Sequence, residues 1–217
     1  MLKYSERTDS WTWMMLAPKK TAAKHAKMRE LGFADGLENF GMPIIMTYLP
    51  LLLFALALSG NLKPDYLAAM IFSLAATTFG IFVVSFSFTF MAYEVAKRLG
   101  GSAELGRLYY MVSLAAAPTF VFTIVINIAV IIIKSIMEAI AFPISALGVF
   151  QLGDLVAASV TVYGFYLLTL SIDALYKFGK RKAVAVWLAP TLVLVAAGIL
   201  LFSTVLFGLL GFLVKTL

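Results

Sequence analysis

The chain of 217 residues is 62% hydrophobic and only 13% charged, a composition that excludes an ordinary soluble domain and indicates an integral membrane protein. It has no cysteine and one histidine, which excludes disulfides, thiolate metal sites and a histidine-built metal site within one chain. The net charge of +6 does not indicate nucleic acid, because basic loops of membrane proteins mostly set orientation and attract anionic lipid.

The segment 1–40 is polar and basic, and we expect it to be a cytoplasmic N-terminal segment ahead of a transmembrane domain over residues 41–217. No signal peptide is predicted, because the first residues mix both charge signs and no apolar core precedes a small-residue cleavage site. Trp11 and Trp13 suit a membrane interface, where tryptophan is enriched.

A short basic helix is predicted within residues 18–31, because Pro18 is a suitable first-turn residue. Its alanines give only a weak apolar face, so membrane association would depend on lysine and arginine meeting anionic lipid. A solvated basic segment explains the same composition. His25 is expected to be an exposed bystander in this helix.

Five stretches are long and apolar enough to cross a bilayer, whose hydrocarbon core needs about 20 apolar residues of helix. The expected spans cover residues 42–59, 67–92, 108–133, 155–172 and 183–214. The second contains VSFSFTF, which alternates like a strand, but an unpaired strand in lipid would leave its backbone polar groups unsatisfied. The predicted fold class is therefore all-α, a polytopic membrane helix bundle with five transmembrane helices.

The stretch between the third and fourth spans, residues 134–154, does not fit a plain loop. It is too apolar for water, and Glu138 and Pro143 interrupt it too much for a span. We expect a short interfacial or re-entrant segment on the outer face. It either caps the bundle, which is the favoured role, or gates a substrate.

The distribution of basic residues predicts the orientation of the chain. Fourteen of the 17 lysines and arginines lie in residues 1–40 and in the connections 93–110 and 173–182. The other three lie on the opposite side: Lys63, Lys134 and Lys215. By the positive-inside rule, the N-terminus is cytoplasmic and the C-terminus external. An odd number of spans also places the two termini on opposite sides of the membrane.

The connection at residues 93–110 carries the signals of a helix stop, a turn and a new helix. Gly100 suits the left-handed C′ position that ends a helix, and Gly101 is expected to loosen the chain for its reversal. Ser102 is the expected N-cap of the next helix, with Glu104 in its first turn. This connection is therefore predicted to be a cytoplasmic elbow between two membrane helices.

The same construction recurs at residues 176–183, with Gly179 as the expected helix stop and three cations after it. Both connections thus place tyrosine, glycine and basic residues at one membrane surface. Ordinary interfacial anchoring explains such residues, and the alternative is a docking surface for a cytoplasmic partner or for anionic lipid headgroups. The candidate cytoplasmic interaction surface comprises Tyr93, Glu94, Lys97, Arg98, Gly100, Gly101, Lys180, Arg181 and Lys182.

Four short motifs occur in order along the chain. They are WTWMMLAPKK near the N-terminus, a YE…GG elbow after the second span, Pro118 inside the third span, and KRKAVAVWLAP before the last. Together with five spans in this orientation, they resemble the Yip1 family of small multipass membrane proteins, as a prokaryotic-type member. That family is associated in eukaryotes with vesicle trafficking and with binding of prenylated small GTPases. No DLYGP-like motif is found, so GTPase binding is not carried over.

No catalytic, metal-binding or cofactor-binding residue is predicted. The sequence has no GxSxG or HExxH motif, and the expected spans carry no ionisable residue in their central regions. Asn127 and Pro118 form a candidate intramembrane polar site, in a span that also holds Ser113, Thr119 and Thr123. Interhelical hydrogen bonding explains this polar stripe, and a substrate path is the alternative.

These features predict a non-enzymatic membrane scaffold or adaptor of Yip1 type, acting through protein contacts or as an accessory subunit of a membrane complex. The alternative is a small transporter or permease for an uncharged solute. The expected partners are the lipid bilayer, anionic lipid headgroups and other membrane protein subunits, without nucleic acid. The expected location is the cell (plasma) membrane.

Overall fold

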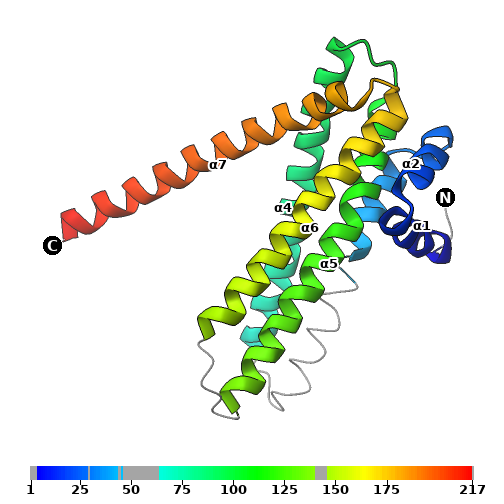
Figure 1. The fold of residues 1–217 in the computed structure, drawn as a ribbon. Helices are drawn as coiled ribbons and strands as arrows, with labels where there is room; N and C mark the ends of the chain where they lie inside the picture. The colour runs from blue at the N-terminus through cyan, green and yellow to red at the C-terminus, as the bar shows by residue number, and fades with distance from the viewer. Residues whose placement is uncertain (1–3, 29, 44, 46–63, 140–145, 217) are drawn as a thin grey trace.

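The computed structural model describes residues 4–28, 30–43, 45, 64–139 and 146–216, and within these it is all-helical (Figure 1). The labelled helices are α1 (Tyr4–Leu16), α2 (Pro18–Lys27), α4 (Pro64–Arg98), α5 (Leu105–Ala139), α6 (Ala146–Tyr176) and α7 (Lys180–Thr216). A further helical stretch covers residues 33–43. The all-α prediction is therefore confirmed for the part of the chain that the structure describes.

Four of these helices are long and apolar enough to cross a membrane. The candidate spans are Ile71–Arg98, Leu105–Val130, Gly153–Tyr176 and Lys180–Thr204. They contain or overlap the second to fifth expected spans. Almost all of the expected first span, residues 42–59, lies outside the described residues.

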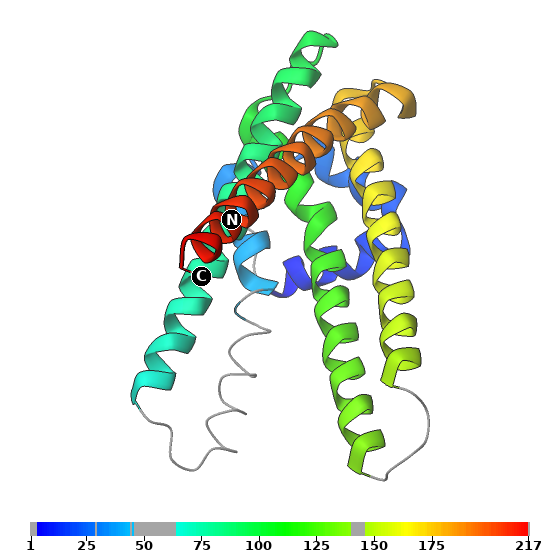
Figure 2. The same ribbon diagram turned by 90° about the vertical axis from the view of Figure 1, so that its left-hand side faces the viewer.

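The long helices differ in how they are arranged. Figures 1 and 2 show α5 and α6 running alongside each other, α4 diverging from them toward the end far from the connections, and α7 leaving at a wide angle after the connection that follows α6. The VSFSFTF sequence is helical within α4, as expected for backbone in lipid. Prolines at positions 118 and 190 lie inside α5 and α7 without ending either helix.

The expected separate segment at residues 134–154 is not found in the described residues. Residues 134–139 continue α5, and residues 146–154 form the start of α6. A separate short helix is therefore wrong for these two flanks, which continue the long helices, whereas residues 140–145 with Pro143 lie outside the described residues and the place of the segment at the outer face stays a prediction. The helices α5 and α6 are therefore longer than the spans that hydropathy marked.

The buried core lies at one end of the bundle, where α1, α2 and the helical stretch 33–43 pack around α5 and α6 (Figure 1). Trp11 and Met14 of α1 are buried there with Leu108 and Met111 of α5 and Ile172 of α6. Trp11 is only 8% exposed, so its expected place at a membrane interface is wrong. Trp13, which is 58% exposed, remains available for that role.

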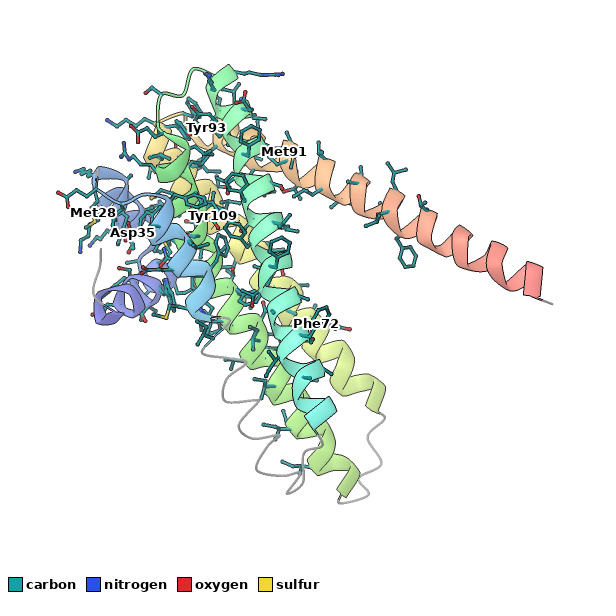
Figure 3. The ribbon with its side chains drawn as sticks, turned by 180° about the vertical axis from the view of Figure 1, so that it is seen from behind. Met28, Asp35, Phe72, Met91, Tyr93 and Tyr109 are labelled. Atoms are coloured by element: carbon teal, nitrogen blue, oxygen red, sulfur yellow. The ribbon has the colours of Figure 1, made fainter. Side chains whose placement is uncertain are left out.

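Toward the opposite end, the long helices expose apolar side chains. Phe72 on α4, labelled in Figure 3, is strongly exposed, as are Val125 on α5 and Leu155 on α6. On α7, consecutive residues from Ile199 to Phe202 are all exposed. Exposed apolar surface of this extent is typical of helices that face lipid.

Candidate functional site

The connection between α4 and α5 reverses the chain through a glycine-terminated helix end. Gly100 has a φ of +91°, and its N–H donates to the carbonyl of Lys97 at 3.1 Å. The N–H of Gly101 donates to the carbonyl of Ala96 at 2.9 Å. This pair of bonds is a Schellman motif with Gly100 at the C′ position. The predicted role of Gly100 as the helix stop is confirmed.

The next helix begins later than the sequence indicated. α5 starts at Leu105, and the carbonyl of Glu104 accepts the N–H of Leu108 at 3.1 Å, which makes Glu104 the N-cap. The expected N-cap at Ser102 was therefore wrong. A Cβ on Gly106 would lie only 3.1 Å from the backbone nitrogen of Phe33. Close packing against the stretch 33–43 thus positions the first turn of α5.

The connection between α6 and α7 is closed by an aspartate. Lys177 has a φ of +56°, and its N–H donates to the carbonyl of Asp173 at 2.7 Å. The carboxylate of Asp173 accepts the N–H of Gly179 at 2.7 Å, and the carbonyl of Gly179 accepts the N–H of Ala183. Lys177 therefore ends α6 and Gly179 caps α7. The predicted role of Gly179 as the stop was wrong, because Asp173 holds both ends of the turn.

The two connections lie at the same end of the bundle and contact each other (Figure 1). A Cβ on Gly101 would lie 2.7 Å from two ring atoms of Tyr176, so the ring reaches this position only because residue 101 is glycine. The Tyr176 ring stacks on Phe178 with centroids 5.0 Å apart. Gly101 is thus a packing position, and its expected role in loosening the chain is wrong. We call residues 93–104 and 176–182 the paired elbows.

The nine residues predicted as an interaction surface all lie in the paired elbows. Six are exposed: Lys97, Arg98, Gly100, Lys180, Arg181 and Lys182. Tyr93, labelled in Figure 3 near the end of α4, is half-buried against the core, and Glu94 and Gly101 are also half-buried. The ammonium of Lys182 lies 5.8 Å from the centroid of the Phe178 ring. The exposed part of this surface is therefore mainly cationic.

The N-terminal helices dock on α5 through a buried polar pair that the sequence did not predict. His25 is 3% exposed, and its Nδ1 lies 2.7 Å from the hydroxyl oxygen of Tyr110. Its expected role as an exposed bystander is wrong. Burial, with a smaller effect from the charge of Lys24, lowers the pKa of His25 to about 4. The imidazole is therefore neutral at pH 7.

A second set of buried hydrogen bonds joins α1, the stretch 33–43 and α5. The indole of Trp11 donates to the side-chain oxygen of Asn39 at 3.3 Å, and the Asn39 amide donates to the hydroxyl of Ser113 at 3.1 Å. The Ser113 hydroxyl in turn donates to the carbonyl of Tyr110 at 2.7 Å. Ser113 was expected in a polar stripe of the third span, and it faces the N-terminal part of the chain.

The candidate intramembrane polar site is described only in part. Pro118 is buried within α5, whereas the side chain of Asn127 is outside the part that the structure describes. A mostly apolar cavity of about 680 Å³ lies between the stretch 33–43 and α4, α5 and α6. Thr119 and Thr123 line this cavity, and their hydroxyl groups donate to carbonyls of α5 at 2.7 and 2.9 Å. The described lining therefore suits apolar matter better than an ion.

Comparison with known families decides the class of the protein. The family model of the Yip1 domain matches residues 15–213.

The chain belongs to the Yip1 family.

No curated protein and no solved structure matches it. The Yip1 match contains the paired elbows and Pro118, which contributed to the resemblance in the sequence. It begins after Trp11 and Trp13, so these two tryptophans lie outside the matched residues. The protein is thus a multi-pass membrane protein of the Yip1 family.

In this Yip1-family chain, the start of α5 is the surface on which the N-terminal helices dock, and the sequence contained one signal for it. Tyr109, Tyr110 and Ser113 gather three polar side chains in the first turns of an apolar span, where tyrosine also suits interfacial anchoring. The Tyr109 ring packs at 4.6 Å from the ring of Phe33, and a Cβ on Gly36 would overlap it. Figure 3 shows Tyr109 beside the helical stretch that carries Asp35. Polar aromatic residues at this end of α5 thus mark a protein contact.

Proposed function

We propose that this Yip1-family protein is a non-enzymatic membrane scaffold or adaptor that binds another membrane protein subunit through the paired elbows. It crosses the cell (plasma) membrane five times, with the N-terminus and both elbows in the cytoplasm and the C-terminus outside. The excess of basic residues in these segments supports that orientation.

The contact between the two elbows is the observation that carries this proposal. The Tyr176 ring against Gly101 joins two turns that are far apart in the sequence. Two loops that support each other form one surface, and a preformed surface loses less conformational entropy on binding than two separate loops. The Schellman motif at Gly100 and the aspartate bridge at Asp173 fix each loop from within.

The charge of the elbows indicates the chemistry of the partner. Lys97 and Arg98 end α4, and Lys180, Arg181 and Lys182 begin α7, all with exposed side chains. Arginine is enriched at protein interfaces, and cationic surfaces speed association with acidic ones. The partner is therefore expected to present an acidic cytoplasmic segment close to the membrane.

Site-specific photocrosslinking in native membranes tests the proposal. A photoreactive amino acid at Arg98 or Arg181 should give discrete protein crosslinks, whereas the same amino acid at Phe202, a 69% exposed position on α7, should give none. The double variant Lys180→Glu/Arg181→Glu should abolish the crosslinks formed at Arg98. The proposal is wrong if the elbow positions and Phe202 give the same pattern, or if the double variant leaves the Arg98 crosslinks unchanged.

A matched control separates a specific surface from general charge. Lys19 and Lys27 are exposed cations of α2, and Lys19→Glu/Lys27→Glu changes the net charge by the same amount. This variant should keep the crosslinks from Arg98. Loss in both double variants would show that overall charge, and not the paired elbows, governs association.

The alternative function, transport of an uncharged solute, is favoured by one observation, the cavity of about 680 Å³ beside α5. Under that function, Asn127→Leu should abolish a measurable flux while thermal stability stays nearly constant. Under the adaptor function, the same change should alter stability modestly, since hydrogen bonds within membranes contribute about 0.6 kcal/mol on average.

A further inference from the structure

A second cavity, of about 530 Å³, lies between α1 and α2 and is distinct from the paired elbows. α1 forms one wall with Asp9, Ser10 and Trp13. α2 forms the other wall with Lys20 and Lys24, and the buried Thr21 and His25 also line it. We call this cavity the α1–α2 groove.

The charges of the groove are unevenly divided between its walls. Lys20 and Lys24 are one helical turn apart on α2 and both are exposed, so their ammonium groups can reach one ligand together. Asp9 on α1 is the single carboxylate in the lining, and His25 is neutral at pH 7. Two lysines against one aspartate leave a net positive charge of one. The lining thus complements a ligand of net negative charge.

The α1 wall lies beside a part of α6 that carries no charge. The hydroxyl of Tyr163 donates to the carbonyl of Met15 at 2.7 Å, which fixes the end of α1 at the level of Tyr163. This level is about 20 Å along the helix from the end of α6 at Tyr176. No charged residue occurs in α6 between Asp154 and Asp173. The end of α1 therefore lies beside an uncharged part of α6, and the groove starts within one turn of it, at Trp13 and Ala17.

His25, next to Lys24, bonds Tyr110 near the start of α5, so the lysine wall lies closer to the paired elbows than the end of α1 does. In a bilayer, buried charges are relieved when long side chains reach toward the interface and when headgroups or water are drawn inward. Trp13, exposed on the α1 wall, suits the level of the headgroups. Figure 2 shows α1 running across α5, which it contacts. A headgroup drawn into the groove satisfies Lys20 and Lys24.

We propose that the α1–α2 groove binds the anionic headgroup of a membrane phospholipid, with the phosphate between Lys20 and Lys24 and the acyl chains alongside α6. The site rests on the membrane placement described above, and it does not depend on the adaptor role. It would anchor the N-terminal helices to the lipid as well as to α5.

Thermal unfolding of the purified full-length protein in detergent tests the site. The probes are dihexanoyl phosphatidylglycerol, which carries one net negative charge, dihexanoyl phosphatidylcholine, which carries none, and inorganic phosphate, all at constant ionic strength. Phosphatidylglycerol at ten times its Kd should raise Tm by about 3–6 °C. The other two probes should raise it by less than a third of that amount.

Two matched variants locate the effect. Lys20→Gln/Lys24→Gln should remove the rise in Tm with phosphatidylglycerol, whereas Lys97→Gln/Arg98→Gln, which removes two cations from the paired elbows, should keep it. An equal rise with both phospholipids would overturn an anionic site. An equal rise with inorganic phosphate would overturn lipid as the ligand. If only the elbow variant lost the rise in Tm, the lipid site would not be the α1–α2 groove. That outcome would leave the crosslinking test of the adaptor function unaffected.

Discussion

Gly100 and Gly101 are neighbours, yet each is a glycine for a different reason. Gly100 needs its backbone conformation, with a φ of +91° and no atom within 4 Å of an added Cβ. Gly101 needs its missing side chain, because the Tyr176 ring occupies that space. Alanine at the two positions therefore tests two different physical causes, backbone strain at Gly100 and steric overlap at Gly101.

Gly100→Ala should lower the free energy of unfolding by about 1–2 kcal/mol, since the left-handed region costs other residues about that much. In a protein of this size that loss lowers Tm by about 2–8 °C in detergent. Gly198→Ala is the matched control, because Gly198 is helical and also has no atom near an added Cβ. The control should leave Tm unchanged or raise it. A similar loss in both variants would remove the case for a left-handed stop at Gly100.

His25 makes the docked N-terminal helices sensitive to acid. Its pKa is about 4 when buried and 6.5 when free, so below pH 6.5 the undocked state binds a proton that the docked state does not. The stability of the docked state is therefore highest above pH 6.5, and it is lost as the pH falls toward 4. Between pH 6.5 and 5 the loss should be about 1.5 kcal/mol.

The measurement for His25 is the dependence of Tm on pH between 7.5 and 5. His25→Gln keeps an acceptor for the Tyr110 hydroxyl, and it cannot titrate in this range. The variant should lose less Tm over that interval than the wild type. Curves of equal slope would show that His25 does not control the docking of α2.

At the scale of the elements, the paired elbows couple α4–α5 to α6–α7. Gly101→Ala should cost about 1–3 kcal/mol by overpacking, because the Tyr176 ring is held by its stacking on Phe178. In a Tyr176→Ala background the same change should cost less, by about 0.5–3 kcal/mol, which is the range of coupling energies for residues in contact. Thermal unfolding of the wild type, the two single variants and the double variant gives this coupling energy directly.

Tyr176→Phe is the control for that cycle, since it keeps the ring. The Tyr176 hydroxyl is buried without a hydrogen-bond partner among the described residues, so its removal should cost little. In this background Gly101→Ala should retain its full cost. The contact between the elbows is unimportant if Gly101→Ala costs the same beside alanine as beside phenylalanine.

Part of this element structure was predictable from the sequence, for a physical reason. The four described long helices and the stop at Gly100 follow from hydrophobic runs and from a glycine signal, both of which are local along the chain. The stop at Lys177 depends on the carboxylate of Asp173 bonding Gly179 across the turn. Local propensity favours glycine as the stop there, so the sequence misplaced it.

The docking of α1 and α2 was not predictable from local sequence. His25 and Tyr110 are 85 residues apart, and Asn39 and Ser113 are 74 apart. Each of these side chains is ordinary in its own segment, and only the fold brings the partners together. The basic composition of α2 indicated an exposed helix. Its buried face consists of only Thr21, Ala22 and His25, which is too few residues to form an apolar pattern in the sequence.

At the scale of the whole molecule, the paired elbows form one end, the N-terminal helices dock on the side of the same half, and the other half exposes apolar helix surface (Figures 1 and 3). The basic segments of the sequence gather at the first end. This division between a protein-packed basic end and a lipid-facing end is what the proposed orientation requires. The adaptor surface and the lipid groove both depend on it.

Labelling of single cysteines in intact cells tests this orientation most directly, because the native chain has no cysteine. The two positions are Ser102, which is exposed in the first elbow, and Thr216, at the end of α7. With a membrane-impermeant thiol reagent, Thr216→Cys should be labelled in intact cells and Ser102→Cys only after the cells are opened. Labelling of Ser102→Cys in intact cells would place the paired elbows outside and contradict the proposed cytoplasmic interaction surface.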